Sequence, residues 1–167
     1  TETGTTLTLN NASSLAISGA GTIDGTLSLT GGSLLTTGGA LTVNSQVAGM
    51  NGTVTSGGDM TFAGGLSTTG LGNVLNAVGH TLTLGAASSL TGATVNAGTL
   101  AVNGATTVDA NSLLNVSGAT GIGVALTLNG GRGTHELGTM IDNSGSLTVG
   151  EGGSAAGGRD HFRGGLD

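Results

Sequence analysis

The chain has 167 residues, of which 36 are Gly; Pro and Cys are absent, and the only aromatic residues are Phe62 and Phe162. Charged residues make up 7% of the chain, against roughly 25% in an ordinary domain. The formal net charge is −6, and without any Lys the chain offers no basic patch, which argues against nucleic acid or an anionic membrane as a partner. No apolar run approaches the roughly 20 residues of a membrane helix, so we expect no membrane insertion.

A short alternating triplet (aliphatic, small polar, aliphatic) recurs along the chain and predicts β-strands, because period-two alternation buries one face and exposes the other. The middle residue is often Thr, whose β-branched side chain suits the outer face of a strand. The copies in chain order are Leu7-Thr8-Leu9, Leu15-Ala16-Ile17, Leu27-Ser28-Leu29, Leu41-Thr42-Val43, Met60-Thr61-Phe62, Leu82-Thr83-Leu84, Leu100-Ala101-Val102, Leu114-Asn115-Val116, Leu126-Thr127-Leu128 and Leu147-Thr148-Val149.

Turn residues fill the gaps between the triplets. Gly pairs stand at Gly31-Gly32, Gly38-Gly39 and Gly57-Gly58, and Asn-Gly pairs begin at Asn51, Asn103 and Asn129. No stretch has the i, i+3, i+4 spacing of a helix. The sequence therefore predicts an all-β protein.

The spacing of the apolar centres indicates how these strands are arranged. From Leu27 onward the centres follow one another at steps of six or seven residues, and after Leu82 at steps of five to eight. Three such steps add up to about 18 to 22 residues, a reasonable circumference for a three-sided coil with one short strand on each side. About seven coils at a spacing of about 4.8 Å would make a rod on the order of 35 Å long.

A β-solenoid accounts for this composition better than an antiparallel β-sandwich or β-prism, which remain the alternatives. Hairpin proteins need strands of about five or six residues and a thick core with aromatic side chains. The alternating segments here have three to five residues, and such short strands gain stability by stacking on neighbours above and below. The absence of Pro fits, because Pro would delete a ladder hydrogen bond.

The pattern stops near Val149, which predicts a solenoid over residues 1–149 and a Gly-rich flexible tail or linker over 150–167. The segment Gly150 to Gly158 consists almost entirely of Gly, Ser and Ala. The last residues, Arg159 to Asp167, hold two of the three Arg residues and could be a tail, a docking peptide or a connection to another domain.

The repeats from Thr5 to Val149 resemble passenger-domain repeats of bacterial autotransporter adhesins, which contain runs of the type Gly-Thr-Leu-x-Val-Asn-Gly. Ala97-Gly98-Thr99-Leu100-Ala101-Val102-Asn103-Gly104 is the nearest copy, and Gly25-Thr26-Leu27-Ser28-Leu29-Thr30-Gly31 is another. The resemblance implies a right-handed parallel β-helix at or outside the bacterial cell surface.

Some solenoids carry an active site of clustered carboxylates on one face of the coil, often with Arg or Lys. The candidates here are scattered along the chain, and no pair of neighbours is separated by about one coil: Asp24, Asp59, Asp109, Glu136 and Asp142. We therefore expect no shared carboxylate site.

The richest local cluster consists of Arg132, His135, Glu136 and Asp142. It is open to two interpretations, an acid/base or metal site using His135 and Glu136, or a solvated loop that interrupts the repeat. Adjacent residues of a strand point to opposite faces, which weakens a shared site. His80 precedes the strand predicted to begin at Thr81, and we expect it to be a turn residue. Asp160 and His161 could together bind a metal ion, but the surrounding Gly residues do not hold the two side chains in a fixed arrangement.

Two further side-chain patterns suggest structural uses. Asn-x-Ser/Thr triplets begin at Asn11, Asn51 and Asn115, and we expect these Asn residues to face inward at coil corners and to stack into hydrogen-bonded ladders. Outward Thr residues suggest an ice-binding surface, which needs a regular Thr-x-Thr row on one face. The pairs that fit are irregularly spaced: Thr6 and Thr8, Thr53 and Thr55, and Thr81 and Thr83.

Taken together, these patterns predict a non-catalytic solenoid with a structural or adhesive role, and the resemblance implies that it is an extracellular passenger segment of a surface adhesin. We predict no enzyme activity, no catalytic or metal-binding residue and no cofactor. The expected partner is a protein or surface receptor, or a second copy through the solenoid ends, whose strand edges need covering. The alternatives are a self-assembling fibre subunit that stacks end to end, a polysaccharide-acting enzyme and an ice-binding solenoid.

Overall fold

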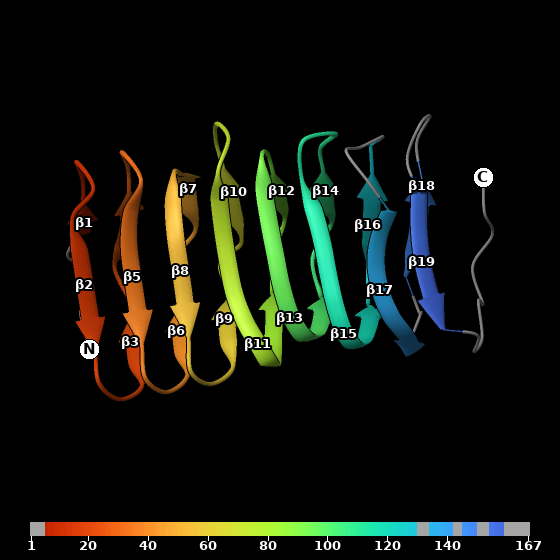
Figure 1. The fold of residues 1–167 in the computed structure, drawn as a ribbon, viewed down its shortest axis with the longest axis horizontal. Helices are drawn as coiled ribbons and strands as arrows, with labels where there is room; N and C mark the ends of the chain where they lie inside the picture. The colour runs from red at the N-terminus through yellow and green to blue at the C-terminus, as the bar shows by residue number, and fades with distance from the viewer. Residues whose placement is uncertain (1–5, 130–133, 142–144, 150–153, 159–167) are drawn as a thin grey trace.

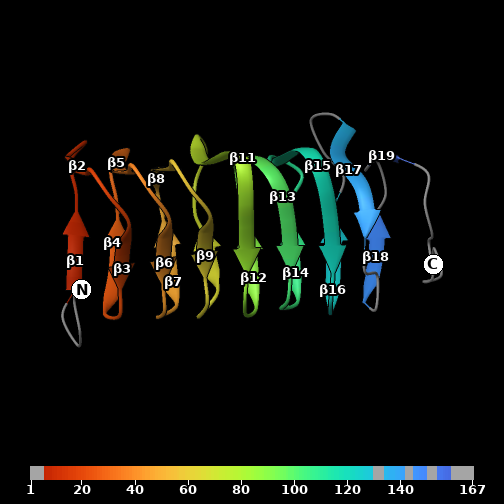
Figure 2. The same ribbon diagram turned by 90° about the horizontal axis from the view of Figure 1, so that it is seen from below.

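The computed structural model describes residues 6–129, 134–141, 145–149 and 154–158. Parallel strands wind into a β-solenoid of about seven turns, and the described residues include no helix. In Figure 1 the chain runs down the front and up the back as it advances from β1 to β18, which is right-handed winding. The view in Figure 2 shows the same succession of coils. The predicted fold class is confirmed, and no helix suited to spanning a membrane occurs in the described ranges.

The coil has three sides, here called faces A, B and C. Face A consists of β1 (Thr6–Leu9), β4 (Thr26–Leu29), β7 (Val47–Met50), β10 (Leu66–Thr68), β12 (Ser88–Leu90), β14 (Thr106–Val108), β16 (Ala125–Leu128) and β18 (Ser146–Val149). Face B consists of β2 (Ser14–Ile17), β5 (Ser33–Thr37), β8 (Gly52–Ser56), the first parts of β11 (Asn73–Leu84), β13 (Ala93–Val102), β15 (Leu113–Ile122) and β17 (Thr134–Ile141), and β19 (Ser154–Gly158). Face C consists of β3 (Gly21–Ile23), β6 (Leu41–Val43), β9 (Met60–Phe62) and the second parts of β11, β13, β15 and β17.

The alternating triplets lie in these strands and build the core. Their outer two residues point inward, so that aliphatic side chains stack in columns along the solenoid axis. One such column on face B contains Leu35, Val54, Leu75, Val95 and Leu114 in register. Each of these side chains is buried, so every interior coil covers the apolar surface of the coil before it and of the coil after it.

The length of one coil agrees with the spacing of the apolar centres. Register partners lie between 18 residues apart (Ser89 and Thr107) and 22 residues apart (Thr61 and Thr83). This variation arises in the turns, which insert or omit residues while the strands stay aligned. It explains why no side chain recurs at a fixed interval in the sequence.

Several strands are longer than the three to five residues expected from the triplets. The longest, β11, spans Asn73–Leu84 and covers parts of faces B and C. Its pairing with β13 is interrupted by a register shift between Ala77 and Thr81, at the corner that contains Gly79 with φ +75°. The strand therefore bends around the corner without a separating turn, which alternation alone does not predict.

A column of Gly residues makes these bends possible. A Cβ atom on Gly118 would lie 2.5 Å from the carbonyl oxygen of Gly98, and one on Gly138 would lie 2.3 Å from that of Gly118. Because these distances are far below van der Waals contact, only Gly lets the backbones of successive coils stack at this corner.

Buried hydroxyl groups satisfy backbone carbonyls at other corners. The Thr37 hydroxyl donates to the Gly39 carbonyl at 2.9 Å, and Ser56 donates to the same oxygen at 2.9 Å. Thr68 likewise donates to the Thr91 carbonyl at 2.9 Å. These inward polar side chains carry the hydrogen bonds that a buried turn would otherwise lack, and they break the simple triplet pattern in β5, β8 and β10.

The ends of the solenoid differ from its middle. In the first coil the inward side chains Leu7, Leu15 and Ile17 are only half-buried. At the other end, β19 (Ser154–Gly158) pairs with β17 inside the segment expected to be a Gly-rich tail. The remainder of 150–167 lies outside the described residues, so a domain boundary at Val149 stays a prediction.

Candidate functional surface

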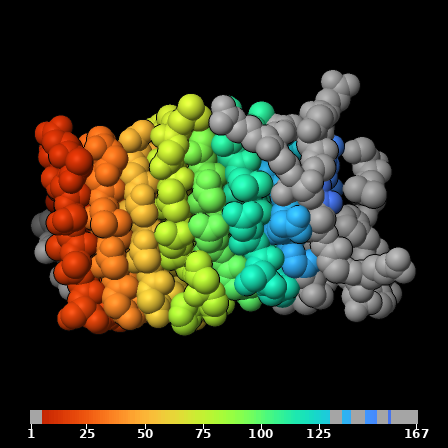
Figure 3. All heavy atoms as spheres, in the orientation of Figure 1, coloured from red at the N-terminus to blue at the C-terminus, as the bar shows by residue number. Residues whose placement is uncertain are grey.

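The outer side of face B carries two parallel columns of side chains, one residue per coil in each. The first column contains Leu34, Thr53, Val74, Thr94 and Leu113 in register. All five are exposed or half-buried, and Leu34 is 39% exposed. Figure 3 shows the successive coils of this side as bands across the molecule. The result is an uncharged strip in which aliphatic and hydroxyl side chains alternate.

The second column contains a ladder of amides, here called the Asn ladder and defined as Asn76, Asn96 and Asn115. These residues occupy equivalent outward positions on β11, β13 and β15. The Asn115 amide donates to Asn96 Oδ1 at 2.9 Å, and the Asn96 amide donates to Asn76 Oδ1 at 2.7 Å. The equivalent outward positions are occupied by Thr36 and Thr55 in the two coils before Asn76, and by Glu136 in the coil after Asn115.

The Asn ladder corrects one expectation from the sequence. Of the Asn residues expected to stack inward at corners, Asn115 does stack, but in the middle of a strand and on the outer side. Asn51 lies at a corner, where its amide donates to the Thr69 carbonyl at 3.1 Å, and Asn11 lies in an exposed turn. Outward amides are favourable here because their unused donors and acceptors still reach water.

Faces A and C carry hydroxyl columns. On face C, Thr22, Thr42, Thr61 and Thr83 occupy equivalent outward positions in consecutive coils. On face A the outward column is Ser67, Ser89, Thr107, Thr127 and Thr148. The outward Thr residues of the triplets are thus divided between different faces, which their spacing in the sequence does not reveal.

The carboxylates Asp24 and Asp59 lie at separate corners and bind their own neighbours. The Asn44 amide donates to Asp24 Oδ1. Asp59 Oδ1 accepts the Thr81 N–H at 2.9 Å. Both side chains therefore join one coil to the next, and the structure does not bring them together.

Asp109 organises the turn after β14. Partial burial raises the pKa of this carboxyl, but hydrogen bonds from Ser112, Gly92 and Asn111 outweigh that effect and hold the pKa below its usual value. The Ser112 hydroxyl lies 2.6 Å from Asp109 Oδ1, and the Gly92 N–H lies 3.1 Å from the same oxygen. The carboxylate is thus engaged in stabilising the turn.

Two members of the predicted cluster, His135 and Glu136, lie on opposite sides of one strand. His135 and Glu136 are consecutive on β17, and His135 is fully buried whereas Glu136 is exposed. Arg132 and Asp142 lie outside the described residues. The interpretation of His135 as part of a solvated loop is wrong, because it lies in register with Leu114 in the inward column of face B. The alternation of His135 with Leu137, which is also buried, is the signal that could have placed it there.

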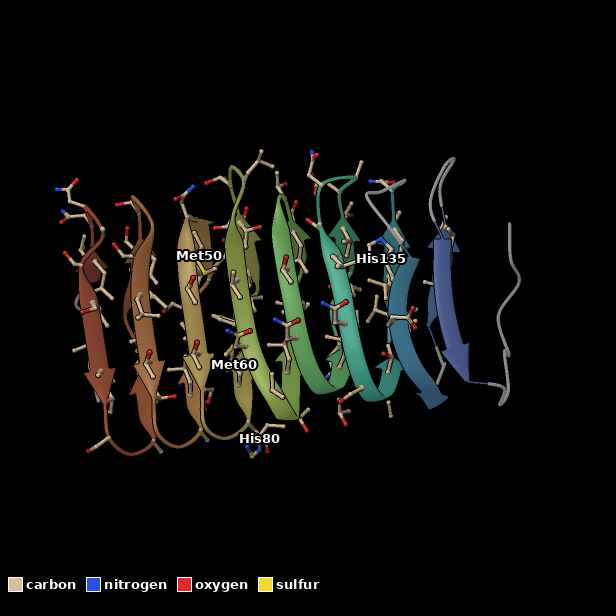
Figure 4. The ribbon with its side chains drawn as sticks, viewed as in Figure 1. Met50, Met60, His80 and His135 are labelled. Carbon is tan, nitrogen blue, oxygen red and sulfur yellow. The ribbon has the colours of Figure 1, made fainter. Side chains whose placement is uncertain are left out.

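Figure 4 shows how differently two of the His residues are placed. His80 lies at the exposed corner of β11, whereas His135 points into the interior between the faces, as Met50 and Met60 do. Asp160 and His161 lie outside the described residues. Within the described part of the chain, no group of three or more His, Cys, Asp or Glu side chains could hold a metal ion.

Comparison with known proteins gave no relatives: no family model, no curated protein and no solved structure matches this chain. The outer columns are therefore the features from which a function can be argued.

Proposed function

We propose that the chain is a non-catalytic structural or adhesive rod at or outside the bacterial cell surface, as a passenger-type segment of a surface adhesin. Its partner is a protein or surface receptor that contacts the outer faces. The observation that supports this proposal is the Asn ladder with the flanking column of Leu34, Thr53, Val74, Thr94 and Leu113.

These columns suit adhesion because each coil adds one outward side chain to each of them: amides in the Asn ladder, and alternating aliphatic and hydroxyl groups in the neighbouring column. Strands in a parallel stack lie about 4.8 Å apart, so face B offers donors, acceptors and apolar contacts at a regular spacing. Each contact of this kind is weak, and many of them acting together on one rigid surface raise the overall strength of binding. A rod with such a side can hold a partner along its length.

Adhesion can be measured on cells that display the chain. The chain is fused to a surface anchor in a non-adherent bacterial strain, and retention on immobilised host cells and on bare polymer surfaces is measured under flow. We expect the displaying cells to be retained more than the parent strain. Asn96→Asp, which places a charge in the Asn ladder, should reduce retention, whereas Asn10→Asp in an exposed turn of the first coil should not. Equal retention of displaying and parent cells would count against an adhesive role.

The enzyme alternative predicts a different result in a simple assay. Incubation of the purified chain with a panel of polysaccharides should release no new reducing ends. Release that is lost on Glu136→Ala would instead favour the polysaccharide-acting enzyme, since Glu136 is an exposed carboxylate beside the Asn ladder.

A second candidate function is supported by the half-buried core side chains of the first coil. The first coil contributes Leu7, Leu15 and Ile17 to the inward columns. The second coil covers these side chains on one side, and they remain half-buried. A second copy stacked end to end would cover them and continue the strand ladders, which would produce a fibre.

End-to-end stacking predicts association that depends on concentration. Sedimentation velocity over a range of concentrations should show a series of oligomers, and Ile17→Glu should remove them by placing a charge in the contact. Leu71→Glu is the matched control, because Leu71 is 65% exposed in a turn away from the first coil. A single monomeric species at all concentrations would exclude the fibre.

The Thr column of face C bears on the ice-binding alternative. An ice-binding face needs a second Thr column beside the first, and the residues two positions before Thr22, Thr42, Thr61 and Thr83 are Ala20, Ala40, Asp59 and Thr81. Only the last of these is Thr, so the column supports the adhesive rod more than an ice-binding surface. Thermal hysteresis in a freezing assay would reverse this preference.

A further inference from the structure

His135 occupies a position that is aliphatic in the preceding coils. The inward column of face B runs through Leu35, Val54, Leu75, Val95 and Leu114, and His135 follows Leu114 as the next member. The side chain is 0% exposed. An ionisable ring therefore occupies, in this coil, the inward position that holds Leu or Val in the preceding coils.

The hydrogen bonds of this ring require its neutral form. Nδ1 accepts the N–H of Leu114 at 3.2 Å, so Nδ1 carries no proton in the folded state. Nε2 is buried and has no hydrogen-bond partner among the described residues. A second proton would turn Nδ1 into a donor facing the Leu114 donor and would leave a positive charge in the core without a partner.

The strands that pair with β17 provide no group that could compensate this charge. β15 and β19 contain no Asp, Glu, Lys, Arg or His, and neither do β16 and β18 on face A, whose buried side chains include Leu126 and Leu147. Glu136, on β17 itself, is exposed on the opposite side. Arg132 and Asp142 precede and follow this part of β17 in the chain and lie outside the described residues.

We propose that His135 makes the C-terminal coils an acid-sensitive section of the rod, in which protonation of the ring opens β17 and β19 while the earlier coils stay folded. Opening can be local because each coil contacts only its neighbours. β19, the strand that pairs with β17 on its other side, has the sequence Ser-Ala-Ala-Gly-Gly, without a large apolar residue. Acidification would thereby free the edge of β15 for a new partner.

The direction of the pH effect follows from the environment of the ring. Burial lowers the pKa of His135 from its ordinary value of 6.5, so the opened state binds a proton at a higher pH than the closed state does. The closed state is therefore at full stability above pH 6.5 and loses stability as the pH falls from there to the pKa of the buried ring. Over that window the equilibrium constant for opening rises by up to about tenfold per pH unit.

Amide hydrogen exchange followed by mass spectrometry tests the proposal on the whole chain. Exchange is measured from about pH 7.5 down to about pH 4.5 and is corrected for the intrinsic pH dependence of the amides. Peptides covering 134–141 should lose protection on acidification, while peptides covering 41–62 keep theirs. His135→Gln, which stays neutral and can still accept the Leu114 N–H, should remove this pH dependence, whereas His80→Gln at the exposed corner should leave it unchanged.

The outcomes separate an acid-sensitive section from a merely structural His. His135→Leu restores the aliphatic column and should give protection that is high and independent of pH. Loss of protection in 134–141 on acidification that persists in both His135→Gln and His135→Leu would overturn the proposal, as would constant protection of 134–141 in the wild type. If either variant fails to fold, NMR titration of the wild-type ring decides: a pKa at or above 6.5 in the folded chain contradicts the mechanism.

Discussion

At the scale of single residues, the first turn of the rod contains a strained backbone. Asn11 and Ala12 have φ +52° and +60°, and the equivalent residues one coil later are Gly31 and Gly32, with φ +65° and +75°. A left-handed conformation costs an L-residue such as Ala roughly 1–2 kcal/mol, whereas Gly adopts it freely and Asn tolerates it. The turn needs this geometry because the Ala12 N–H donates to the Gly31 carbonyl at 3.0 Å.

Replacing Ala12 with Gly should therefore stabilise the chain. We expect Ala12→Gly to raise the free energy of unfolding by about 0.5–1 kcal/mol, because the relief of strain exceeds the extra entropy of Gly in the unfolded state. Urea denaturation of the variant and the wild type measures the difference. Ala16→Gly, on the exposed side of β2, should lower stability by a similar amount, so a loss in both variants would contradict the strain argument.

The Asn ladder makes a second prediction at this scale. Asn96→Asp removes the donor to Asn76 and places two acceptors face to face, and the half-buried site leaves these groups partly unpaired. We expect a loss of about 1–2 kcal/mol at neutral pH. Asn10→Asp, in an exposed turn, should change stability by less than about 0.5 kcal/mol. Equal effects of the two substitutions in chemical denaturation would show that the ladder contributes nothing to folding.

At the scale of the strands, the sequence predicts much of the fold and little of the surface. The triplets mark strands correctly because alternation depends only on neighbouring residues. The inward orientation of hydroxyl side chains, such as Thr37 in β5 and Ser56 in β8, is not predicted from the sequence. A buried Thr or Ser cannot be distinguished from an exposed one until its carbonyl partner is known. The Asn ladder is not predicted for another reason: the turns vary in length, and their lengths determine which residues of successive coils lie in register.

The Gly column between faces B and C can be tested by a single methyl group. Gly118→Ala would place Cβ 2.5 Å from the Gly98 carbonyl oxygen, so the coils must move apart or the corner must distort. We expect a loss of about 1–3 kcal/mol, as for other overpacked sites. Gly19→Ala is the matched control, because its Cβ would meet no atom within 4 Å. Thermal unfolding of both variants gives the comparison, and a neutral Gly118→Ala would mean that the corner is not tightly stacked.

At the scale of the whole molecule, the coil is a repeating unit that contacts only its neighbours. Such a chain should tolerate the loss of one complete coil, because the strands on either side of the gap can pair in the same register. Leu84 and Val102 are register partners, so deleting residues 85–102 puts Leu84 in the place of Val102. Strand β11 would then pair with β15 in the register that β13 has now. In the shortened chain, Asn115 would stack directly on Asn76 and the ladder would continue.

We expect the chain lacking 85–102 to fold into a rod shorter by about 4.8 Å, with the circular dichroism of a β-protein and a single unfolding transition. Small-angle X-ray scattering measures the change in length. Deleting only 85–93 removes half a coil and moves the apolar side chains of all later strands out of register with the core, so that chain should fail to fold. If both deletions behaved alike, the rod would not be the sum of equivalent coils. Neither the core columns nor the outer columns could then be treated as properties of the repeat.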